Sequence, residues 1–156
     1  MIKNERQFRI TKTQRDKFAQ ALEEALASSE QSTLHPLLKK AQQDALRSQL
    51  LELDEQIKEY EDLRAGNTKL EIQSLEDLPE LLIKARIAAG LTQKDLAKKL
   101  GLKEQQIQRY EATAFASINL SKFVQIIKVI GLTIPQHLLF SLTKIDNQQN
   151  NTSVVI

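Results

Sequence analysis

The sequence predicts an all-α protein. Glycine and proline occur only four and three times in 156 residues, which favours long helices because these two residues interrupt regular structure most strongly. Each proline stands just before a helix-like apolar pattern and each glycine follows one, the positions that helix starts and ends favour. With 41% hydrophobic residues the chain can form a core. We expect an N-terminal helical hairpin or coiled-coil region at residues 1–66, a linker at 67–77 and a five-helix domain at 78–142.

Composition excludes several classes of protein. Cysteine is absent, which rules out disulfide scaffolds, thiolate zinc sites, iron–sulfur clusters and cysteine nucleophiles, and fits a reducing compartment. No apolar run approaches the roughly 20 residues of a membrane span, and the charged N-terminus is unlike a signal peptide. We therefore expect a cytoplasmic protein with no membrane partner.

The first helix is expected to begin near Thr11. Thr11 with Gln14 three residues later resembles a capping box, and Phe18, Leu22 and Leu26 follow at helical spacing. This helix should end near residues 28–32.

A second helix is expected over residues 36–64 and would be roughly 45 Å long at 1.5 Å per residue. Its apolar stripe is narrow, and its flanks are charged. The stripe consists of Leu46, Leu50, Leu53, Ile57, Tyr60 and Leu63. Such a helix packs on the first helix as an antiparallel hairpin, pairs with a second copy of the chain, or does both.

The charge is unevenly distributed. Residues 1–77 carry 12 basic and 15 acidic side chains, a net −3, whereas residues 78–140 carry nine basic and four acidic ones, a net +5. Residues 143–156 include a run of Asn and Gln and are expected to form a mobile tail. The basic second half suggests an anionic partner.

Four short helices are expected in the second half, at residues 79–89, 93–100, 104–111 and 120–130, with a fifth at 135–142. The second and third of them are the informative pair. Thr92 is a good N-cap with Asp95 three residues on, Ala97 lets a second helix cross closely, and Gly101 permits a tight turn. This combination predicts a helix-turn-helix.

The same residues resemble a known family. The segment Gly-Leu-Thr-Gln-Lys-Asp-Leu-Ala-Lys-Lys-Leu-Gly at 90–101, followed by Gln-Ile-Gln-Arg-Tyr-Glu at 106–111, is similar to the phage-repressor and Cro (XRE) helix-turn-helix regulators. The likeness covers about residues 78–140. It implies a transcriptional repressor that reads a palindromic operator as a homodimer. The whole layout also resembles bacterial regulators of this family that act as antitoxins, repress their own operon and bind a cognate toxin.

The resemblance and the side-chain chemistry together assign a DNA interface. Glutamine suits adenine, arginine suits guanine, and lysines and helix N-termini hold phosphates. The residues expected at base edges are Glu104, Gln105 and Arg109. The residues expected at phosphates are Gln93, Lys94, Lys103 and Gln106. Arg86 and Glu111 fall where the family often has a buried ion pair, and we assign them to structure.

Two departures from the family pattern concern the ends of the helix at 104–111. Lys103 stands where a serine or threonine is common and cannot cap the helix, so the helix start must rely on a neighbouring residue or on the DNA. Residues 112–116 replace a glycine that usually follows the closing Glu111, which predicts different phosphate contacts in that loop.

Two other function classes fit the sequence less well. No metalloprotease, phosphate-loop or hydrolase motif is present, and His35 and His137 fit capping or packing better than catalysis, so we expect no enzyme activity, metal or cofactor. The remaining alternative is a protein-neutralising module in which residues 1–66 bind a partner and the helix-turn-helix has lost DNA binding.

Overall fold

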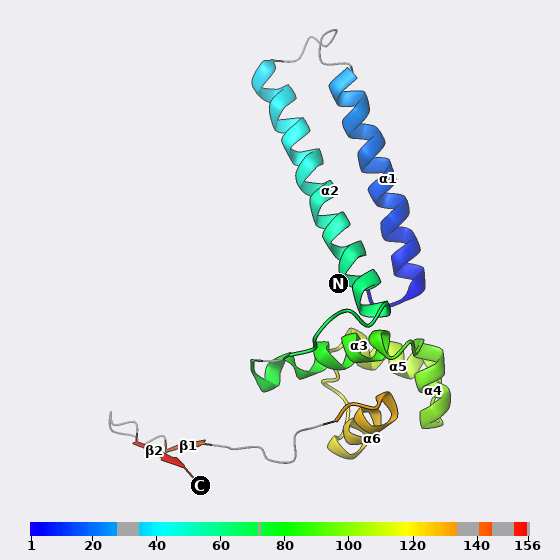
Figure 1. Ribbon diagram of the computed structural model, residues 1–156, viewed down its shortest axis with the longest axis vertical. Helices are drawn as coiled ribbons and strands as arrows, with labels where there is room; N and C mark the ends of the chain where they lie inside the picture. Colours follow the sequence, from blue (N-terminus) through cyan, green and yellow to red (C-terminus); the bar gives the residue numbers. More distant parts are fainter. Residues whose placement is uncertain (28–34, 72, 134–140, 145–151, 156) are drawn as a thin grey trace.

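The computed structural model describes residues 1–27, 35–71, 73–133, 141–144 and 152–155, in which a long helical hairpin stands on a bundle of short helices (Figure 1). The hairpin consists of α1 (Glu5–Ala27) and α2 (Pro36–Arg64). A 3-10 turn, η2 (Leu75–Asp77), leads into the bundle of α3 (Leu78–Ala88), α4 (Gln93–Leu100), α5 (Glu104–Ala112) and α6 (Leu120–Ile130). The predicted all-α fold is confirmed, and the bounds of the helices from α2 onwards lie within one residue of expectation.

The C-terminal segment differs from the prediction. Strands β1 (Ser141–Lys144) and β2 (Thr152–Val155) pair antiparallel, with Ser141 opposite Val155 and Lys144 opposite Thr152. The tail was expected to be mobile because of its Asn/Gln run, and no strand was expected in it. Three of the four residues of β2 are β-branched, and such residues favour strands. The end of the expected fifth helix is wrong because residues 141 and 142 lie in β1, while residues 135–140 of that helix and His137 lie outside the described residues.

Helix α1 begins six residues before the predicted start. The Asn4 side-chain oxygen accepts a hydrogen bond from Gln7 N at 2.9 Å, and Gln7 Oε1 accepts one from Lys3 N at 2.8 Å. These two bonds satisfy one backbone donor in the first turn and one just before the helix. Thr11 lies inside the helix, so the capping box proposed at Thr11 and Gln14 was wrong.

The two long helices pack antiparallel along the predicted stripe of α2 (Figure 1). Its lower residues, from Leu53 to Leu63, are buried, and Phe8 of α1 stacks on Tyr60 with ring centroids 4.9 Å apart. Burial, and secondarily the charge of Glu5, raises the pKa of Tyr60 above its ordinary value. At the other end of α2, Nδ1 of His35 accepts a hydrogen bond from Leu37 N at 3.3 Å, which gives this histidine a capping role.

The base of the hairpin and the bundle share one hydrophobic core. Ile2, only 3% exposed, joins Tyr60 and Leu63 of the hairpin in a cluster that continues into the bundle. The buried bundle members are Leu82, Ile83, Ile87, Leu96, Ala97, Ile107, Phe115, Ile126 and Ile127. The core therefore extends across the predicted linker at residues 67–77, because apolar side chains from the N-terminus and from α2 pack against the bundle.

Candidate nucleic-acid interface

Helices α4 and α5 are set by local capping interactions. Thr92 Oγ1 accepts a hydrogen bond from Asp95 N at 3.0 Å, while Asp95 Oδ2 accepts one from Thr92 N at 3.1 Å. Hydrogen bonds from Thr92 hold the pKa of Asp95 below its ordinary value. Helix α4 ends at Gly101 with φ of 67°, a left-handed conformation that glycine adopts without steric cost. A short turn of three residues then aims α5 across α4.

The start of α5 relies on a neighbouring glutamine. Lys103 makes no side-chain capping hydrogen bond, and Gln106 Oε1 accepts the backbone N–H of Lys103 at 2.9 Å. Gln106, expected at a DNA phosphate, therefore stabilises the helix start in the free protein. Its exposed amide nitrogen is not used in this bond.

The exposed face of α5 carries the residues expected to read bases. Ile107, which is fully buried, anchors the opposite face in the core. Gln105 and Arg109 are exposed and, within the described part of the chain, their side chains have no hydrogen bond or ion pair. They lie four residues apart, on the same side of the helix. Glu104 is also exposed, and its Oε1 accepts a hydrogen bond from Gln108 at 3.2 Å.

The expected ion pair between Arg86 and Glu111 is present and buried. Each residue is 2% exposed, and two hydrogen bonds join them, Nε to Oε1 at 2.5 Å and Nη2 to Oε2 at 2.9 Å. Such bidentate pairs fix geometry as well as charge. Arg86 also donates to the carbonyl oxygens of Leu91 at 2.8 Å and Lys3 at 2.7 Å. The pair thus ties α3, the start of α4, α5 and the N-terminus together.

Gln93 belongs to this buried network. It is only 6% exposed, its Nε2 donates to Glu111 Oε2 at 2.7 Å, and its Oε1 accepts a hydrogen bond from Asn4 at 3.4 Å. The side-chain amide was expected to clamp a phosphate, but in this conformation it is occupied by protein partners. Its backbone N–H remains in the first turn of α4, where such groups have no intrahelical partner.

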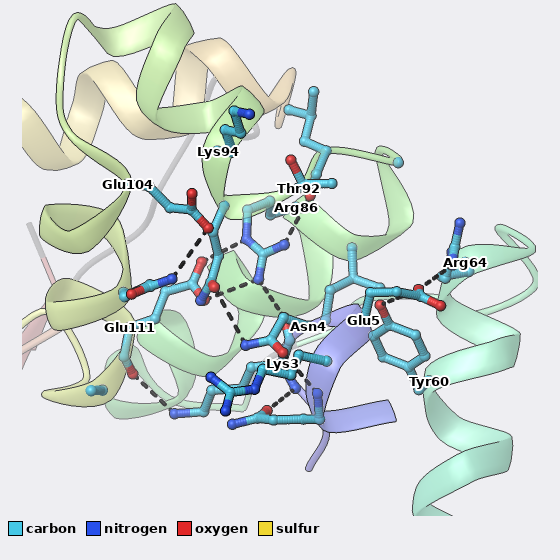
Figure 2. Close-up of a pocket in the computed structure, with 18 of the residues that line it drawn as sticks. Lys3, Asn4, Glu5, Tyr60, Arg64, Arg86, Thr92, Lys94, Glu104 and Glu111 are labelled. Carbon is cyan, nitrogen blue, oxygen red and sulfur yellow. Dashed lines mark hydrogen bonds and ion pairs between the residues drawn. The ribbon is translucent and has the colours of Figure 1, made fainter. Parts of the chain in front are cut away.

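Sequence reasoning missed the two N-terminal members of the network. Asn4 reaches Gln93, and Lys3 Nζ donates to the Glu111 carbonyl at 3.0 Å (Figure 2). About 90 to 110 residues separate these partners along the chain, so no local pattern links them. The one available signal was the Asn4–Gln7 spacing, which marks the start of α1.

Part of the second half of the chain matches a known family. Residues 82–136 match the model described as Helix-turn-helix. The segment is an XRE-type helix-turn-helix domain. Domains of this type bind DNA and regulate transcription. No curated protein and no solved structure matches the chain. The matched segment spans about a third of the chain and leaves the hairpin outside it.

A cleft of about 1160 Å³ lies between the helix-turn-helix domain and the first turns of α1. Figure 2 shows Thr92 and Lys94 from the start of α4 and Glu104 from α5 on one side, with Lys3 and Asn4 opposite them. Lys94 and the more distant Lys103 are exposed, and within the described residues neither forms an ion pair. Both are available to an anionic ligand.

The loop after α5 is strained where this sequence lacks the usual glycine. Ala114 and Phe115 have φ values of 47° and 59°, in the left-handed region that side chains disfavour. Phe115 is buried and packs edge-on against Phe123, with ring centroids 5.8 Å apart, and its N–H donates to the Tyr110 carbonyl at 2.7 Å. The aromatic contact holds a loop conformation that the backbone alone would not favour.

Membrane insertion finds no support in the helices. Among the residues that the structure describes, no helix is both long enough and apolar enough to cross a bilayer.

Proposed function

We propose that the protein is a sequence-specific DNA-binding repressor that inserts α5 into the major groove. The observation that carries the proposal is the exposed pair Gln105 and Arg109, whose side chains have no partner within the described residues and project from the second helix of the helix-turn-helix. Gln105 suits an adenine edge and Arg109 a guanine edge. Glu104 accepts from a cytosine amino group or orients its neighbours.

The phosphate contacts in this proposal come from side chains and backbone. Lys94, in the first turn of α4, and Lys103, just before α5, are exposed cations within a segment of net charge +5. Gln93 and Gln106 contribute through the first turns of α4 and α5, where backbone N–H groups favour anions. Their side-chain amides stabilise the domain. These contacts fix the register of the protein on DNA without selecting sequence.

The operator is proposed to be palindromic and bound by a homodimer. One recognition helix reads too few base pairs for a useful site, and two copies would meet half-sites about 34 Å apart. The lower part of the α2 stripe is buried within one chain, so a dimer seam requires another surface. The exposed leucines Leu37 and Leu38, 71% and 60% exposed, support association through the hairpin. Sedimentation of the full chain measures the state of association.

The first prediction separates base contacts from phosphate contacts. Gln105→Ala and Arg109→Ala should each weaken operator binding by roughly 1–3 kcal/mol while barely changing binding to random DNA, since base-edge contacts discriminate sequence. Lys103→Ala is the matched control and should weaken binding to both DNAs. Fluorescence anisotropy titrations on an operator selected from random duplexes measure these affinities. An equal loss on the two DNAs for Gln105→Ala and Arg109→Ala would reject the assignment.

An antitoxin role with autoregulation is the finer form of the proposal. It adds that the hairpin binds a cognate toxin and that the operator lies upstream of the gene. The exposed leucines at the far end of the hairpin also support the second candidate function, a protein-neutralising module without DNA binding. Salt-dependent binding to the upstream DNA distinguishes the two, and a small toxin-like reading frame beside the gene favours the antitoxin form.

A further inference from the structure

The cleft beside the helix-turn-helix domain has a wall that lies outside that domain. Arg6, Gln7 and Ile10, from the first turns of α1, line it together with Lys94 of α4 and its N-cap Thr92. Glu104 and Gln108 of α5 line it as well. The start of the hairpin therefore faces the two helices that define the proposed DNA interface.

Four of the eight charged side chains that line the cleft are paired with one another. Arg86 is paired with Glu111, and Arg64 with Glu5 at 2.6 Å. Arg6 is exposed and, in the part of the chain that the structure describes, forms no ion pair. Arg6 on α1 and Lys94 on α4 are thus exposed cations on opposite walls, whereas Lys3 is partly buried and donates to the Glu111 carbonyl. Glu104, at the start of α5, is the acidic lining residue that has no ion pair within the described residues.

Both residues of this pair line a cleft beside the helix that is expected to cross the DNA backbone. In helix-turn-helix complexes the recognition helix enters the major groove while the preceding helix crosses the backbone. Here the preceding helix is α4, whose N-terminus opens on the cleft. The Gln93 side chain is buried at this point and its amide donates to Glu111, so an exposed donor from α1 is better placed to reach a phosphate there.

We infer that Arg6 binds a DNA phosphate across the cleft from Lys94, which makes the first turn of α1 part of the DNA interface. The inference rests on the proposed function and deepens it. A guanidinium binds a phosphate with two parallel hydrogen bonds. Burial of Ile2 and the Asn4–Gln93 hydrogen bond hold the first turn in place beside α4. The hairpin then contributes to affinity, in addition to any role in association.

The test is the salt dependence of DNA binding by full-length Arg6→Gln. Each phosphate contact contributes about 0.9 to the slope of log affinity against log salt. The variant should lose about 0.9 of slope on operator and random DNA alike, which is about eightfold in affinity at 0.1 M salt. Lys17→Gln is the matched control, because Lys17 is exposed on the same helix about 16 Å further along and, like Arg6, has no ion pair within the described residues.

The outcomes separate this inference from the function on which it rests. If the wild type binds DNA and Arg6→Gln keeps the slope of the wild type and of Lys17→Gln, the inference is overturned and the proposed function stands. If the wild type itself shows no salt-dependent binding, both fall. Thermal melts of both variants, expected to match the wild type, confirm that the comparison is between folded proteins.

Discussion

Glu111 is the residue on which the two halves of the protein converge. Its carboxylate accepts hydrogen bonds from Arg86 and Gln93, and its carbonyl accepts one from Lys3. All of these groups are withdrawn from solvent to some degree, so the network must be complete to be stable. A carboxylate at the end of the recognition helix thereby fixes both the helix and the N-terminus.

Removing this carboxylate should unfold the protein more easily. Glu111→Ala leaves the Arg86 guanidinium buried without its counter-ion, and we expect the free energy of unfolding to fall by about 3–5 kcal/mol. Glu104→Ala, an exposed site on the same helix, serves as the control and should change little. Urea unfolding followed by circular dichroism measures both. Equal midpoints for the two variants would show that the ion pair contributes nothing.

The sequence-based expectations succeeded where a side chain's role depends on its own segment. Thr92, Asp95 and Gly101 were assigned correctly, because capping and turn chemistry act over three or four residues. The burial of Gln93 and its hydrogen bonds to Glu111 and Asn4 were not foreseen, since both partners are distant in the sequence. The type of a residue does not predict which distant segment of the chain will bury its side chain.

At the scale of elements, the end of α5 stores strain in its connection to α6. Ala114 has a φ of 47°, a conformation that costs a residue with a Cβ roughly 1–2 kcal/mol. The loop keeps this conformation because Phe115 is anchored in the core.

Relieving this strain should stabilise the protein. We expect Ala114→Gly to raise the free energy of unfolding by about 0.5–1 kcal/mol, after allowance for the greater freedom of glycine in the unfolded chain. Ala112→Gly, at the helical end of α5, is the matched control and should have the opposite sign, because glycine is a poor helix former. Both are compared by urea unfolding. A loss of stability in Ala114→Gly would contradict the strained conformation.

Helix bounds were predictable from apolar periodicity and from the placement of glycine and proline. Elements were missed or misplaced where these signals are weak. The start of α1 at Glu5 was missed because the residues that follow its cap, Asn4, are polar until Phe8. A polar first turn gives no apolar periodicity from which a helix start can be predicted. Strands β1 and β2 were missed because each is only four residues long, too short for a clear alternation of apolar and polar residues. Neither error touches α4 and α5.

At the scale of the whole molecule, the hairpin and the helix-turn-helix domain form one unit. Ile2, Tyr60 and Leu63 lie in the same cluster as Leu82 and Ile107, and the Arg86–Glu111 network includes the N-terminal backbone. The sequence predicted a linker at residues 67–77, and therefore a hairpin and a helix-turn-helix domain that are independent of each other. The shared core predicts that neither half unfolds without the other, so the geometry of the DNA interface depends on the N-terminal segment.

The two tyrosines allow this central claim to be measured in one experiment. Tyr60 lies in the hairpin and Tyr110 in α5, and they are the only tyrosines in the chain. With 3-fluorotyrosine incorporated and each ¹⁹F signal assigned by a tyrosine-to-phenylalanine substitution, a urea titration reports the unfolding of each half separately. One cooperative unit predicts that both signals convert at the same urea concentration and with the same slope. Two separate midpoints, with Tyr60 converting while Tyr110 keeps its native signal, would contradict the account.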